Sequence, residues 1–84
     1  DSESKQDWKT QKEEQAKIGK RQNDLKKTED EISRLEARDS EINELLEKED
    51  IYTDVAKLME LNTEKEQLQH RLERLYEQWE SLAE

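Results

Sequence analysis

Apolar residues recur along this chain at the heptad spacing that is typical of paired helices. In the first half they fall on two alternating positions of a seven-residue repeat, and in the second half they do so again in a different frame. This pattern predicts an all-α chain. We expect the seam between two helices to contain Ile18, Leu25, Ile32, Leu35, Ile42, Leu58, Leu61, Leu68, Leu72, Leu75, Trp79 and Leu82.

The two heptad frames cannot belong to one continuous helix. Leu46 and Leu58 are 12 residues apart, which is neither a multiple of seven nor a step between the two seam positions. Between them, Thr53 is a candidate N-cap for a second helix, and Asp50 is the alternative. The sequence therefore predicts an antiparallel two-helix coiled-coil hairpin, with helix 1 at about 4–47 and helix 2 at about 53–82.

Charged residues beside the seam favour the antiparallel arrangement. In the register in which facing seam residues have numbers that add up to 100, Glu31 meets Arg71, and Arg38 meets Glu64. A parallel pair of identical chains would instead bring like charges together. The hairpin is therefore preferred over a parallel dimer, although each exposed pair contributes at most about 1 kcal/mol.

Polar residues interrupt the seam at defined places. Asp39 and Lys65 lie one layer apart on opposite helices, where they could pair diagonally and fix the register. Arg21 falls opposite Trp79, and stacking of the guanidinium on the indole would contribute about 0.5–2 kcal/mol.

The first helix is predicted to be longer than the second, because the last seam residue of helix 2 already faces Ile18. We expect residues 1–15 to form a helical overhang or linker to an upstream domain, and residues 16–84 to form the hairpin. Trp8 in the overhang has no partner in the chain, and Gly19 marks a bend at the base of the hairpin.

The composition excludes a broad globular core, since only 29% of the residues are hydrophobic and 46% are charged. The chain has no cysteine, so neither a disulfide nor a thiolate metal site can form. No apolar run approaches the roughly 18 residues that a membrane span needs. The first residues do not resemble a signal peptide. We therefore expect a soluble, cytoplasmic chain without membrane contact.

Basic residues gather near the predicted base of the hairpin, although the net charge is −9. Residues 9–27 carry seven basic and three acidic side chains, a net of +4, whereas residues 28–84 carry a net of −11. Only the basic stretch would attract phosphates, but a charge run of this kind is more often a solvated helix face. The candidate nucleic-acid contacts are Lys17, Lys20, Arg21, Lys26 and Lys27.

Residue types that carry out catalysis do not form a recognisable set. His70 has no second histidine or cysteine with which to hold a metal, and neither a phosphate-binding loop nor a nucleophile with an adjacent base is recognisable. We therefore predict no catalytic, cofactor-binding or metal-binding residue, and no enzymatic activity, for this chain.

The hairpin turn and the C-terminal end carry a family resemblance. The segment Ile51-Tyr52-Thr53-Asp54 and the ending Leu75-Tyr76-Glu77-Gln78-Trp79-Glu80 resemble the turn and terminus of the C-terminal coiled-coil domain of ABC-F ATP-binding proteins, the Uup-like C-terminal domain. The resemblance covers roughly residues 8–84.

This resemblance implies a larger protein whose paired upstream ABC ATPase domains bind ATP and Mg. Proteins of this type have no transmembrane domain and act on ribosomes in translation or antibiotic protection. DNA binding is associated with the domain in the Uup branch, and the net charge of −9 departs from that pattern. We expect a non-catalytic arm that assists contact with ribosomal RNA, DNA or the ribosome. The alternative is a structural spacer or self-association module, either a monomer or a weak dimer.

Overall fold

The computed structural model describes residues 2–84, with side chains from Lys5 onward. It contains the long helix α1 (Ser2–Leu46), the short helix α2 (Glu49–Tyr52) and the long helix α3 (Val55–Ala83). The prediction of an all-α chain is thus confirmed for the described residues. Residue 1, the first of the predicted 1–15 overhang, lies outside them.

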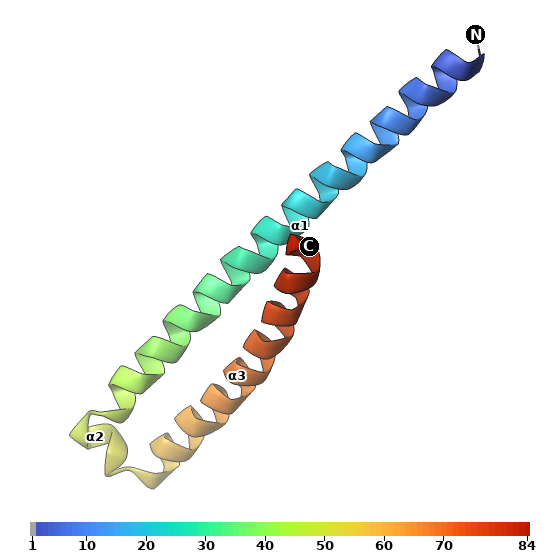
Figure 1. Cartoon of the computed structure of the whole chain (residues 1–84). Coiled ribbons are helices and arrows are strands. Elements are labelled where there is room, and N and C mark those ends of the chain that lie inside the picture. Colours follow the sequence, from blue (N-terminus) through green and yellow to red (C-terminus); the bar gives the residue numbers. More distant parts are fainter. Residues whose placement is uncertain (1) are drawn as a thin grey trace.

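The two long helices lie side by side and run in opposite directions (Figure 1). The molecule measures 77 × 17 × 15 Å. A continuous helix of this chain length would be about 126 Å long, whereas the 45 residues of α1 alone account for about 68 Å. The long dimension is therefore essentially that of α1, and the N-terminal part of α1 extends past the end of α3 (Figure 1).

Apolar residues at the predicted seam positions form the thin core between α1 and α3. Ile42, Leu72 and Leu75 are buried, with Ile42 and Leu75 almost fully so. Thr28 is buried as well, and its hydroxyl donates to the Asp24 carbonyl at 2.8 Å, which satisfies this polar group within its own helix. Seven further predicted seam residues are half-buried: Leu25, Ile32, Leu35, Leu58, Leu61, Leu68 and Leu82.

Two residues predicted for the seam are exposed instead: Ile18 at 54% and Trp79 at 38%. Arg21 of α1 already contacts the last turn of α3, so Ile18, one turn earlier, lies beyond the paired region. The Trp79 indole hydrogen-bonds to a glutamate on the surface of α1, and this contact keeps the ring at the edge of the seam.

The turn between the long helices differs from the sequence prediction. α3 begins at Val55 with Asp54 as its N-cap, whose carboxylate accepts from the Lys57 backbone N–H at 3.2 Å. Thr53 is not the cap, because it closes α2 and its hydroxyl donates to the Glu49 carbonyl at 2.6 Å. The alternative cap Asp50 lies inside α2.

Gly19 lies within the continuous helix α1, which passes through it without a break (Figure 1). Its backbone has no positive φ. The helix is therefore not interrupted at this position, the bend stays a prediction, and an added Cβ atom would meet nothing within 4 Å.

Candidate functional site

An ion pair joins α1 to α3 near the middle of the paired region. Arg38 donates from Nε and Nη2 to the two carboxylate oxygens of Glu64 at 2.6 and 2.9 Å, and its Nη1 lies 2.9 Å from Glu41 Oε1. This two-pronged geometry is the stronger kind of arginine–carboxylate contact. It confirms one of the two interhelical pairs that the register predicts.

The second predicted pair is also present. Arg71 donates from Nε and Nη2 to Glu31 Oε1 at 3.1 and 2.8 Å. Because the two pairs lie seven residues apart on each helix, a shift of either helix by one turn would break both of them. They therefore hold α1 and α3 in one relative position.

Hydrogen bonding shifts the pKa values of both members of the Arg38–Glu64 pair. The hydrogen bonds from Arg38 lower the pKa of the Glu64 carboxyl, and the guanidinium charge acts in the same direction, while partial burial opposes both. The bond to Glu64 raises the pKa of Arg38 in turn, so the guanidinium stays charged. The pair is thus ionised at neutral pH.

Aromatic residues of α3 use their polar groups to reach glutamates of α1. Trp79 Nε1 donates to Glu29 Oε1 at 3.0 Å, and the Tyr76 hydroxyl donates to Glu36 Oε1 at 2.7 Å. The hydrogen bond to Glu36 raises the pKa of Tyr76, and partial burial and the nearby negative charges add to this effect. Both rings thereby tie the C-terminal half of α3 to α1.

The contacts of Arg21 differ from the sequence prediction. It does not stack on Trp79, but donates from Nε to the Leu82 carbonyl at 2.7 Å and from Nη2 to the Ser81 carbonyl at 3.2 Å. The last carbonyls of a helix lack partners within that helix, and the partial negative charge at a helix C-terminus attracts a cation. Arg21 therefore caps the end of α3.

The predicted diagonal pair at the seam is present only as a loose contact. Lys65 Nζ lies 4.0 Å from Asp39 Oδ1, which is too far for a hydrogen bond, and the ammonium donates to Asn43 Oδ1 instead. Asp39 Oδ1 is buried without a hydrogen-bond partner. The carboxylate at this position is therefore incompletely satisfied.

The five residues predicted to contact nucleic acid are all exposed, but they do not share one face of α1. The guanidinium of Arg21 is occupied by α3. At about 100° per residue, Lys17 and Lys26 lie about 60° and 120° around the helix from Lys20. Of the five, only Lys20 and Lys27 project along nearly the same line.

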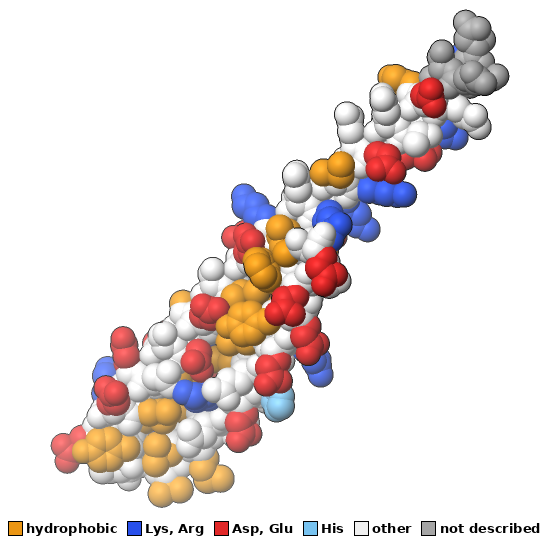
Figure 2. Space-filling model, viewed as in Figure 1, with side chains coloured by type: hydrophobic (Ala, Val, Ile, Leu, Met, Phe, Trp, Pro, Cys, Tyr) orange, Lys and Arg blue, Asp and Glu red, His pale blue; other side chains and the backbone are white. Residues whose placement is uncertain are grey.

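A longer line of cations runs along this flank of α1. Lys9, Lys20, Lys27 and Arg34 are spaced by 11, 7 and 7 residues, which are close to whole numbers of helical turns, and all four are exposed. We call them the basic row; it is about 38 Å long. Lysine and arginine side chains gather where α1 leaves the end of α3 (Figure 2). Arg34 was missed because it lies outside the basic stretch of the sequence.

The part of α1 that α3 does not cover exposes two apolar residues. Trp8 is 65% exposed and Ile18 is 54% exposed. The prediction that Trp8 has no partner in the chain is wrong. Lys12 Nζ lies 5.1 Å from the centre of the Trp8 ring in a cation–π contact. This contact is made within the same helix face and leaves most of the ring accessible.

Among the described residues, no group of three or more histidine, aspartate or glutamate side chains is arranged to hold a metal ion. His70 is exposed on α3. In the same part of the chain, none of the helices combines the length and apolarity needed to cross a membrane.

Comparison with known proteins identifies a family. A family model described as "ABC transporter C-terminal domain" matches residues 19–84, which includes the whole paired region of α1 and α3. No curated protein and no solved structure matches the chain significantly.

Proposed function

The chain belongs to the family of ABC transporter C-terminal domains, and from this membership we propose that it is the non-catalytic arm of an ABC-F type ATPase. In this proposal the ATP and Mg are bound by upstream ATPase domains, and the arm assists contact with nucleic acid or the ribosome in the cytoplasm. The resemblance of the turn and the C-terminal end to ABC-F proteins supports the subgroup.

The basic row is the observation that carries the nucleic-acid part of the proposal. Four exposed cations along about 38 Å of one helix flank can follow the phosphates of roughly one turn of a duplex. Each phosphate that is neutralised releases condensed counterions, and this release dominates sequence-independent affinity. The basic row does not have to enter a groove of the duplex. We therefore expect it to contact the sugar-phosphate backbone of the nucleic acid.

The charge of the rest of the chain restricts how a nucleic acid can approach. Residues 28–84 carry a net charge of −11, which repels phosphates from most of α3 and from the turn. The net positive charge lies in residues 9–27 of α1, which extend from beyond the end of α3 into the start of the paired region. A bound nucleic acid would therefore lie along the base of the arm, with the turn directed away from it.

The test is fluorescence anisotropy of a labelled RNA or DNA duplex with the 84-residue chain at about 50 and 200 mM salt. Four phosphate contacts predict that the affinity falls about 100-fold across this range. Lys20→Glu combined with Lys27→Glu should weaken binding by more than about tenfold at the lower salt concentration.

The matched control combines Lys48→Glu with Lys57→Glu, which changes the net charge equally but lies at the turn. It should leave the affinity nearly unchanged. Absence of binding at about 50 mM salt, or an equal loss in both double variants, would contradict the proposal.

A structural spacer that self-associates is the second candidate, because Trp8 and Ile18 are exposed on the part of α1 that α3 does not cover. Sedimentation at several protein concentrations separates the two functions. The arm proposed above remains a monomer throughout. A self-associating spacer would gain mass with concentration, and Trp8→Ser would then restore the monomer.

A further inference from the structure

Three large apolar side chains are exposed together at the turn of the arm. Tyr52, Val55 and Met59 are 51%, 70% and 66% exposed. Figure 2 shows apolar side chains gathered at the end formed by α2 and the start of α3. We call residues 47–60 the tip. Contiguous exposed apolar patches mark interaction surfaces, whereas single exposed apolar residues do not.

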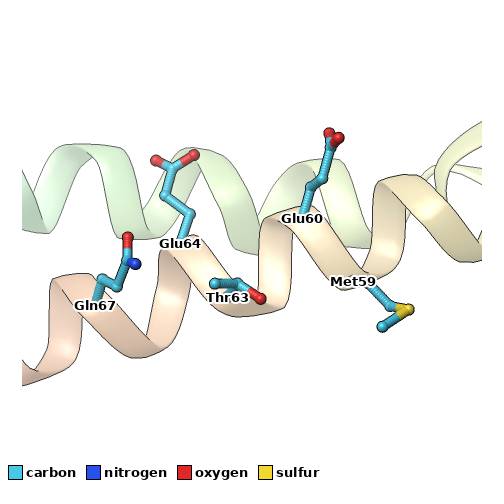
Figure 3. A pocket seen from close by; sticks show the side chains of 5 residues that line it. All are labelled: Met59, Glu60, Thr63, Glu64 and Gln67. Carbon is cyan, nitrogen blue, oxygen red and sulfur yellow. The ribbon is translucent and has the colours of Figure 1, made fainter.

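Two of the exposed side chains of the tip share one helix face, and the third lies at the end of the neighbouring helix α2. Val55 and Met59 are four residues apart on α3 and therefore share a face of the helix. Tyr52 is the last residue of α2, and α2 contacts α3. Figure 3 shows that Met59 turns away from α1. Tyr52 and Val55 are exposed and therefore also lie outside the seam.

A shallow hollow continues the apolar face along α3. Met59, Glu60, Thr63, Glu64 and Gln67 line it. The two glutamates extend on the side of α1, whereas Met59 lies at the end nearest the turn (Figure 3). A side chain that enters the hollow would thus meet a thioether at one end and the Glu60 carboxylate along one edge, because the Glu64 carboxylate is bound by Arg38.

The tip is acidic around its apolar centre. Between residues 47 and 60 there are five acidic side chains against two lysines, a net charge of −3. Within the described residues, the ion pairs between the helices do not use any of these five. Asp54 caps α3, and the charge of the other four remains available for a partner.

We propose that the tip is a docking surface for a protein that presents an apolar face bordered by lysine or arginine residues. Charge complementarity selects this occupant. A nucleic acid or an anionic membrane would face like charge at the tip, and two tips brought together would repel each other. Methionine and tyrosine suit such a contact, because methionine adapts to irregular surfaces and tyrosine is enriched in interface cores.

The proposal is independent of the nucleic-acid contact, since the basic row lies on α1 and ends about a dozen residues before the tip. The two surfaces would let one arm hold two partners. Loss of either binding activity can therefore be observed without loss of the other.

The experiment is an NMR titration of the ¹⁵N-labelled chain with a helical peptide of leucine and lysine whose apolar face is bordered by the lysines. We expect chemical shift changes concentrated at Tyr52, Val55 and Met59. Met59→Ser combined with Val55→Ser should weaken binding at least tenfold. Both residues are exposed, so the helix signals should persist. The matched control is Ile18→Ser, which removes an exposed apolar residue outside the tip and should have no effect.

Each alternative has its own result in this titration. Equal shift changes at Glu73 and Glu77 would show unspecific charge attraction and overturn the proposal. Equal binding of a peptide with glutamate in place of lysine would also overturn it. So would tip shifts caused by an RNA duplex, by phosphatidylserine vesicles, or by raising the concentration of the chain alone.

Discussion

Truncation of Leu75 tests whether the seam stabilises the arm. Leu75 is 1% exposed in α3 and belongs to the small set of fully buried side chains. Leu75→Ala removes three carbon atoms from a place that solvent does not reach. The change should leave the helix itself intact, because alanine has the highest helix propensity.

The expected loss follows from the packing of this position. Leucine-to-alanine substitutions in cores cost about 2–5 kcal/mol, and a seam between only two helices can relax more readily, which points to about 2–3 kcal/mol. An 84-residue chain has about 4–12 kcal/mol of total stability at typical values per residue. Leu75→Ala should therefore remove a large fraction of it.

Urea denaturation followed by far-UV circular dichroism measures this loss. Met59→Ala is the matched control, because Met59 lies on the same helix but is 66% exposed, and such changes stay within about 0.5 kcal/mol. A difference between the two variants of less than about 0.5 kcal/mol would refute the role assigned to the seam. The midpoints should not depend on protein concentration, since the contact lies within one chain.

Three further predictions concern single positions. Gly19→Ala fills open space, so it should strengthen that part of α1 by about 1 kcal/mol and slow nearby amide hydrogen exchange about fivefold; faster exchange would contradict this. Asp39→Leu removes a carboxylate oxygen that lacks a hydrogen bond, so the urea midpoint should rise; a fall would show that the loose contact with Lys65 stabilises the pair. The pKa of Glu64 is lowered by Arg38, so its contribution is present above the unfolded pKa of about 4.3 and is lost as pH falls through the folded pKa. The stability difference between the chain and Glu64→Gln should thus shrink below about pH 4, and a constant difference would exclude this linkage.

The heptad pattern was enough to predict the pairing of the long helices, because burial in a two-helix seam repeats with the period of the helix. The same frame predicted the Arg38–Glu64 contact, since residues beside the seam have fixed neighbours once the register is set. The short helix α2 could not be predicted this way. Its four residues are too few to show a period.

The N-cap of α3 and the contacts of Arg21 depend on which of several suitable groups lies within reach. The sequence alone does not reveal this. Asp50, Thr53 and Asp54 are all residues that favour an N-cap, and only the path of the turn selects Asp54. A guanidinium can stack on an indole or bind carbonyl groups. Arg21 binds carbonyls because the open end of α3 offers them within reach.

The basic row was only partly visible in the sequence. Summing charge over a stretch treats Lys26 and Lys27 as equivalent, although the helix separates them by about 100°. The same sum omits Arg34, which is separated from Lys27 by seven residues but projects along the same line. Positions around the helix, rather than local charge density, determine which cations can act together.

The distance between α1 and α3 in solution tests the central claim that the chain folds back on itself as one arm. The chain lacks cysteine, so Arg34→Cys combined with His70→Cys gives two exposed positions for nitroxide labels. Side-by-side antiparallel helices predict one narrow distance of about 20–30 Å by electron–electron double resonance, unchanged when unlabelled chains are added in excess. A distance near 54 Å, as in one continuous helix, or a short distance that disappears on dilution with unlabelled chains, would contradict the account.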